Sequence, residues 1–105
     1  MSNIVTRNEL QARLSANSRL VLLEALPEKY YNYWHLPGAL HFPHDQARTL
    51  APVVAPYKTA EIVVYCASKT CQNSHIAASV LQQIGYTNVA VYAGGKEDWK
   101  EEVAA

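Results

Sequence analysis

The chain lacks the features that several broad classes of protein require. Nine Lys and Arg residues balance nine Asp and Glu residues, which argues against bulk binding to nucleic acid or to an anionic membrane. No apolar run reaches membrane-spanning length, and the first residues do not resemble a signal peptide. Two cysteines are too few for a disulfide scaffold, so we expect a reduced, cytoplasmic protein. The length of 105 residues, half of them hydrophobic, predicts a single domain over residues 1–105.

Motifs for nucleotide, metal and phosphate chemistry are also missing. No GxxxxGK[ST] or GxGxxG segment is present to hold a nucleotide. Cys66 and Cys71 do not have the C-x2-C spacing of a structural zinc site, so we expect neither a metal nor another cofactor. Six residues after Cys66 stands Gln72, where a C-x5-R phosphatase has the arginine that binds phosphate in a bidentate manner. The sequence therefore argues against a phosphatase.

Strand and helix patterns alternate along the chain. Apolar and β-branched runs predict strands at residues 20–25, 40–42, 61–66 and 89–92. Helices are predicted from the capping box of Thr6 and Glu9 to residue 16, and at residues 28–33, 44–50 (extending toward 54), 74–84 and 96–103. Asn17 is expected to end the first helix as a left-handed cap, and Gly85 is expected to end the helix at 74–84. This order predicts an α/β three-layer sandwich, with a mostly parallel central sheet and helices on both faces.

Cys66 ends the predicted strand 61–66 and is separated by a polar loop from the helix at 74–84. Ligand sites in open α/β sheets lie beyond the carboxyl ends of the strands. Free loop amides and the positive end of a helix dipole stabilise a negative sulfur. We therefore predict a functional thiol at Cys66, with a pKa below the usual value of about 8.5.

Five segments, in order along nearly the whole chain, resemble the rhodanese-like domain family. They are Leu20 to Ala25, Tyr30 with His35-Leu36-Pro37-Gly38-Ala39, Val63-Val64-Tyr65-Cys66, Ala77-Ala78 with Leu81, Gly85-Tyr86 and Val89, and Gly94-Gly95-Lys96-Glu97-Asp98-Trp99. The resemblance implies a rhodanese-like sulfurtransferase that moves sulfane sulfur through a cysteine persulfide. The donor would be a small sulfur-containing anion such as thiosulfate or a polysulfide, and the acceptor a thiol, cyanide or an acceptor protein.

The sequence departs from the pattern of this family in three places. Glu24-Ala25-Leu26 stands where the family usually has Asp-Val-Arg, so an arginine that often braces the fold is missing. The loop after Cys66 is longer than the usual sulfurtransferase loop. It also contains no arginine, because Cys71 stands where the family often has a basic residue. These features resemble a branch of the family with a Cys-x4-Cys loop.

The resemblance makes Cys66 the sulfur carrier and makes the following loop its anion site. The substrate-binding residues expected there are Ala67, Ser68, Lys69, Thr70, Gln72, Asn73 and Ser74. Three roles are open for Cys71: it resolves a Cys66 persulfide by releasing sulfide and forming a disulfide, it carries the sulfur itself, or it has no chemical role. Two other functions also stay open. One is a non-catalytic module that binds a partner protein through the loop or through Tyr30, Tyr31 and Tyr33. The other is a dithiol redox element.

Overall fold

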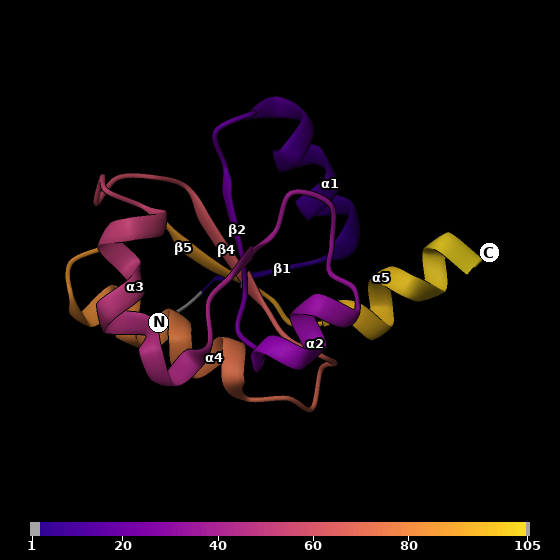
Figure 1. The fold of residues 1–105 in the computed structure, drawn as a ribbon. Helices are drawn as coiled ribbons and strands as arrows, with labels where there is room; N and C mark the ends of the chain where they lie inside the picture. Colours follow the sequence, from indigo (N-terminus) through magenta and orange to yellow (C-terminus); the bar gives the residue numbers. More distant parts are fainter. Residues whose placement is uncertain (1–2, 105) are drawn as a thin grey trace.

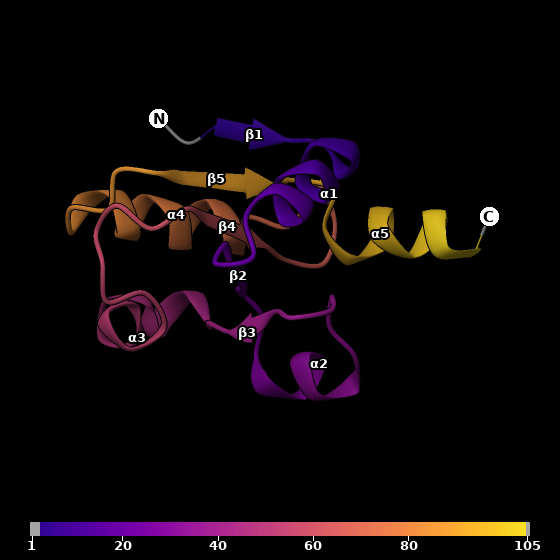
Figure 2. The ribbon, with the colours of Figure 1, turned by 90° about the horizontal axis from the view of Figure 1, so that it is seen from above.

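One parallel sheet forms the centre of the molecule. The computed structural model describes the backbone of residues 3–104 and the side chains of residues 3–100. Within this range, five strands pair in parallel in the order β1-β5-β4-β2-β3, which Figure 2 shows from above. The strands are β1 (Asn3–Val5), β2 (Val21–Glu24), β3 (Leu40–His41), β4 (Ile62–Tyr65) and β5 (Val89–Tyr92). The predicted α/β architecture with a parallel sheet is confirmed.

Helices cover both faces of this sheet (Figure 1). The helices are α1 (Arg7–Ala16), α2 (Glu28–Tyr33), the 3-10 helix η1 (His44–Gln46), α3 (Ala47–Val54), α4 (Asn73–Gln83) and α5 (Gly95–Ala104). Alanines of α3 and α4 pack closely against one face of β2, β4 and β5. Leu10 of α1, Leu36 and the half-buried Trp99 of α5 pack on the other face. The alternation of buried strands and half-apolar helices therefore produces two cores, one on each side of the sheet. No helix among residues 3–104 has the length and apolar character to cross a bilayer.

The element boundaries agree with the sequence patterns, with three exceptions. The edge strand β1 was not predicted, because three residues that are mostly exposed carry no clear alternation. The predicted helix 44–50 is divided into η1 and α3, which continues to Val54. Asn17 has an extended backbone (φ −135°), so its expected left-handed cap is wrong. Its side chain instead binds Glu61 and the N–H of Arg19 while the chain turns into β2. Gly85 does end α4 at φ +103°.

The topology places a crevice beside Cys66. From β2 the chain continues to β3 on one side of the sheet, whereas from β4 it continues to β5 on the other side. Connections that leave two neighbouring strands in opposite directions open a crevice at their carboxyl ends, where α/β proteins bind ligands. Cys66 follows β4 directly, and Glu24 ends β2 opposite Tyr65. Both residues therefore lie at this switch point.

Candidate active site

The sulfur of Cys66 is buried under the loop that follows it. Only 1% of Cys66 is exposed, whereas Cys71 is partly exposed. Cys66 Sγ lies 3.4 Å from the carbonyl oxygen of Cys71, to which it donates, and 3.3 Å from Oγ of Ser74 in the first turn of α4. The predicted meeting of Cys66 with the start of the following helix is therefore present. Ser74 provides this contact.

The electrostatics of Cys66 differ from the expectation. Burial raises the pKa of the Cys66 thiol, and the adjacent Cys71 thiol raises it further. Hydrogen bonds from the hydroxyl and the N–H of Ser74 lower the Cys66 pKa, but they do not outweigh burial. The predicted lowering of the Cys66 pKa is therefore wrong in this structure. The sulfur is buried, and the carbonyl of Cys71 lies beside it where an N–H donor was expected. Burial and the hydrogen bond to the Cys71 carbonyl therefore favour the protonated thiol in this conformation.

The loop is folded back by its own hydrogen bonds. The N–H of Cys71 donates to the carbonyl of Ser68 at 3.1 Å, and the hydroxyls of Ser68 and Thr70 are 3.1 Å apart. The Cys71 amide is therefore not free to hold an anion in this conformation. Of the predicted anion-binding residues, Ser74 is buried against Cys66. The others are exposed or partly exposed, and their role stays a prediction: Ala67, Ser68, Lys69, Thr70, Gln72 and Asn73.

The start of α5 fixes the beginning of this loop. The N–H of Lys96 donates to the carbonyl of Cys66 at 3.0 Å, and the N–H of Glu97 donates to the carbonyl of Ala67 at 2.9 Å. Gly95 makes this approach possible, because a Cβ at that position would lie 2.4 Å from the Cys66 carbonyl oxygen. Gly95 also has φ +65°, which favours glycine. The sequence analysis included Gly94-Gly95 in a family-like segment but did not predict this contact.

A buried ion pair lies at the same end of the sheet. Glu24 is fully buried, and its Oε1 lies 3.0 Å from Nζ of Lys96. The hydroxyl of Tyr65 also donates to this oxygen, at 2.8 Å. Lys96 Nζ donates further to the carbonyl of Tyr30 at 2.8 Å and lies 5.2 Å from the ring centroid of Trp34. Lys96 thus joins α5 to β2 and α2, and it places a buried positive charge against Glu24.

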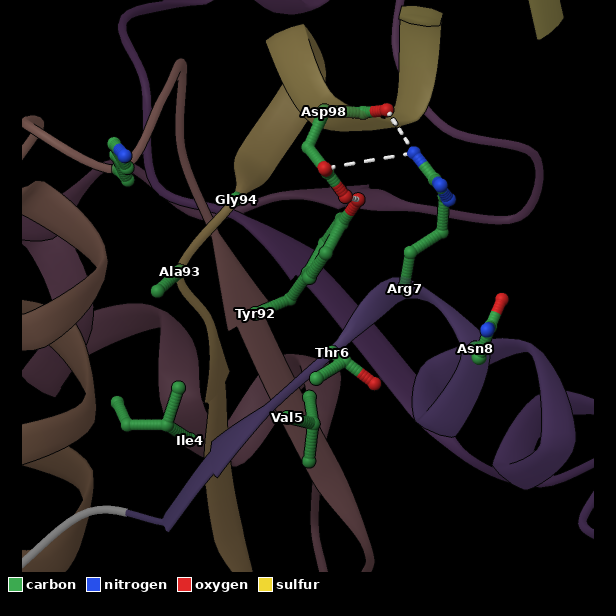
Figure 3. Close-up of a pocket in the computed structure, with 10 residues that line it drawn as sticks. Ile4, Val5, Thr6, Arg7, Asn8, Tyr92, Ala93, Gly94 and Asp98 are labelled. Carbon is green, nitrogen blue, oxygen red and sulfur yellow. Dashed lines mark hydrogen bonds and ion pairs between the residues drawn. The ribbon is translucent and has the colours of Figure 1, made fainter. Parts of the chain in front are cut away.

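A pocket of about 370 Å³ lies beside the loop, between the ends of β1 and β5 and the start of α5 (Figure 3). Arg7 Nη1 lies 3.5 Å from Asp98 Oδ1 and donates to the Asp98 carbonyl at 2.8 Å. Tyr92 donates to the same carboxylate through its hydroxyl. Lys69 lines this pocket together with Arg7, whereas Cys66 does not. The pocket was not predicted, because it is formed around β1.

Aromatic side chains form a second surface feature. Tyr33 is 85% exposed and Tyr30 is 46% exposed, whereas Tyr31 is half-buried. A groove of about 620 Å³ between α2 and α5 is lined by Tyr33, Trp34, His35, Pro37, Trp99 and Lys100. None of the α2 residues is fully buried, so the tyrosine cluster lies at the surface. The described residues contain no cluster of three His, Cys, Asp or Glu side chains that could hold a metal ion.

Comparisons with known proteins agree with this geometry. The model of the family described as "Rhodanese-like domain" matches residues 6–102. The human single-domain sulfurtransferase TSTD1 superposes with a TM-score of 0.82 at 21% identity, over 97% of this chain and 98% of that one. The Saccharomyces cerevisiae single-domain sulfurtransferase RDL2 has a TM-score of 0.78 at 18% identity, over 97% and 91% of the two chains. At these identities, both similarities are evidence for the fold alone.

Curated relatives share more of the sequence. The thiosulfate:glutathione sulfurtransferase of S. cerevisiae is 28% identical over 91 residues, which are 76% of this chain and 64% of the relative. The adenylyltransferase and sulfurtransferase UBA4 of Candida albicans is 26% identical over 87 residues, 79% of this chain. The chain spans about a fifth of UBA4 and under two thirds of the glutathione-linked enzyme. Fold, site position and family match lead to one conclusion: the chain belongs to the rhodanese-like domain family.

Proposed function

We propose that this protein is a sulfurtransferase that carries sulfane sulfur as a persulfide on Cys66. One observation carries the proposal: Cys66 directly follows the central strand β4 at the switch point of the sheet, and its Sγ contacts the first turn of α4. Ser74 presents both a hydroxyl and an N–H to that sulfur. These donors remain useful when the sulfur becomes anionic, because hydrogen bonds to a charged acceptor are stronger than neutral ones.

The reaction has two sulfur-transfer steps. In the first, the Cys66 thiolate attacks the outer sulfur of thiosulfate, a Cys66 S–S bond forms, and sulfite leaves with the electrons of the broken bond. In the second, a thiolate or cyanide attacks the outer sulfur of the persulfide and returns the Cys66 thiolate. Because the resting thiol is protonated and faces the Cys71 carbonyl, the first step requires this part of the loop to move away from Sγ.

A small sulfur-containing anion is the proposed donor, and a thiol is the proposed acceptor. The name of the S. cerevisiae relative, thiosulfate:glutathione sulfurtransferase, supports this pairing. Lys69 carries the formal positive charge of the loop. Its exposed side chain can bind the anionic donor at the loop surface. Ala67, Ser68, Thr70, Gln72 and Asn73 supply the remaining groups of the proposed anion site.

Sulfur loading can be tested on the full chain with thiosulfate. We expect the intact mass to increase by one sulfur atom when it is measured immediately after loading, and we expect thiocyanate to form when cyanide is added at that point. Cys66→Ser should lose both signals, whereas the matched variant Cys71→Ser should keep the sulfur adduct. Loading of Cys66→Ser on Cys71 would contradict the assignment of the carrier. Failure of every variant to load would contradict the sulfurtransferase function.

Binding of a protein partner is a second candidate function. The groove beside the exposed Tyr33 supports it, since large aromatic side chains are typical of interface centres. The similarity to part of UBA4 is in keeping with an acceptor protein as the partner. This function becomes the better explanation if thiosulfate and polysulfide both fail to modify Cys66 in the folded protein.

A further inference from the structure

The second cysteine of the loop is placed directly against the first. The Cys71 thiol is a hydrogen-bonding neighbour of the Cys66 thiol, and the Cys71 carbonyl accepts from Cys66 Sγ. Cys66 is buried and Cys71 is partly exposed, so Cys71 lies on the solvent side of the pair. The two thiols are therefore neighbours within one loop. A disulfide requires this proximity.

The loop is also held in the shape that keeps the thiols together. Its beginning is fixed by hydrogen bonds from α5 to the carbonyls of Cys66 and Ala67, and its end enters α4. Between these points, the hydrogen bond from Cys71 to Ser68 closes a tight turn. The entropy of bringing Cys71 to Cys66 is therefore already lost on folding, which favours reaction within the loop over reaction with a second molecule.

We propose that Cys71 resolves the Cys66 persulfide and releases the transferred sulfur as hydrosulfide. This step rests on the proposed function of Cys66 as carrier. The Cys71 thiolate attacks Sγ of Cys66, the bond between Sγ and the outer sulfur breaks, and hydrosulfide leaves with its electron pair. A Cys66–Cys71 disulfide remains. Two equivalents of a low-molecular-weight thiol reduce it through a mixed disulfide and become oxidised to their own disulfide.

The position of Cys71 favours its attack on the inner sulfur of the Cys66 persulfide. Cys66 Sγ is the inner sulfur of the persulfide, and it lies 3.4 Å from the backbone carbonyl oxygen of Cys71, so the residue that attacks is already beside the atom attacked. The resulting disulfide closes a short loop, so it gains little chain-entropy stabilisation and is readily reduced, as a catalytic disulfide must be. With thiosulfate as donor, the complete cycle converts thiosulfate and two thiols into sulfite, hydrogen sulfide and one disulfide.

A single-turnover experiment on the full chain separates this step from sulfur loading. The protein is loaded with thiosulfate, desalted, and incubated without an acceptor while sulfide and intact mass are followed. We expect the wild type to release about one sulfide per chain and to become lighter than the reduced protein by two hydrogens. Cys71→Ser should retain the added sulfur and release little sulfide over the same period.

The position of the new bond can be read after digestion. Lys69 lies between the two cysteines, so trypsin separates them unless a disulfide joins the peptides. A linked pair of peptides in the non-reduced digest of the wild type is the expected result. A wild-type persulfide as durable as that of Cys71→Ser would overturn the resolving role and leave the carrier intact. Absence of sulfur gain in both proteins would overturn the carrier and this step together.

Discussion

Replacing Lys96 with methionine tests whether the buried ion pair holds together the end of the sheet that carries Cys66. The substitution keeps a long unbranched side chain but removes the charge that lies 3.0 Å from Glu24. Glu24 is fully buried, and among the described residues its Oε2 has no hydrogen-bond partner. Without Lys96, the buried carboxylate of Glu24 would keep the hydrogen bond from the hydroxyl of Tyr65 but would have no positive charge beside it.

The expected loss of stability is large. Removing one partner from a buried ion pair costs about 3–5 kcal/mol, because the other charge is left uncompensated in a medium of low polarity. For a domain of this size, each kcal/mol lowers the midpoint of thermal unfolding by about 4–8 °C, so a decrease of at least about 12 °C is expected. Urea unfolding followed by circular dichroism measures the free energy directly.

Two further proteins make this test specific. Lys100→Met removes an exposed lysine from the same helix, and it should change stability by no more than about 0.5 kcal/mol. Adding Glu24→Gln to Lys96→Met removes the uncompensated charge and keeps an acceptor for Tyr65. The double variant should therefore be more stable than Lys96→Met alone. If Lys96→Met loses no more stability than Lys100→Met, the ion pair does not hold this end of the sheet.

Two other expectations concern the site itself. Alkylation of Cys66 should accelerate with a pH midpoint above that of an ordinary thiol, and this midpoint should fall in Cys71→Ser and rise in Ser74→Ala. A midpoint that is unaltered in both variants would mean that these two contacts do not determine the Cys66 pKa. Gly95→Ala should destabilise the protein by more than Gly38→Ala in urea unfolding. Both residues have positive φ, but the added Cβ has open space at Gly38 and would lie 2.4 Å from the Cys66 carbonyl oxygen at Gly95. Equal losses at the two glycines would mean that only the backbone conformation matters.

Local patterns were sufficient to predict most of the fold. The β-branched run before Cys66 and the helical spacing after it placed the thiol between β4 and α4. The capping box of Thr6 and Glu9 is present in the structure, because both of its hydrogen bonds join residues three apart. Strand β1 escaped prediction for the opposite reason. Its pairing with β5 joins residues about 87 positions apart and leaves no periodic signal in three residues.

The details of the site depend on contacts that no local pattern encodes. The helix start beside Cys66 predicted an acidic thiol, and Ser74 does supply the expected donors. Whether those donors determine the Cys66 pKa depends on how completely the loop excludes water. The turn from Ser68 to Cys71 folds the loop over Cys66, and the resulting burial raises the pKa. In the same way, the sequence of Glu24-Ala25-Leu26 indicated a missing arginine but not that Lys96, from the other end of the chain, forms an ion pair with Glu24. In both cases the residue type was readable from the sequence, but its partner was brought in by tertiary folding. The effect of a charge, or of a thiol close to ionisation, is decided by that partner and by burial.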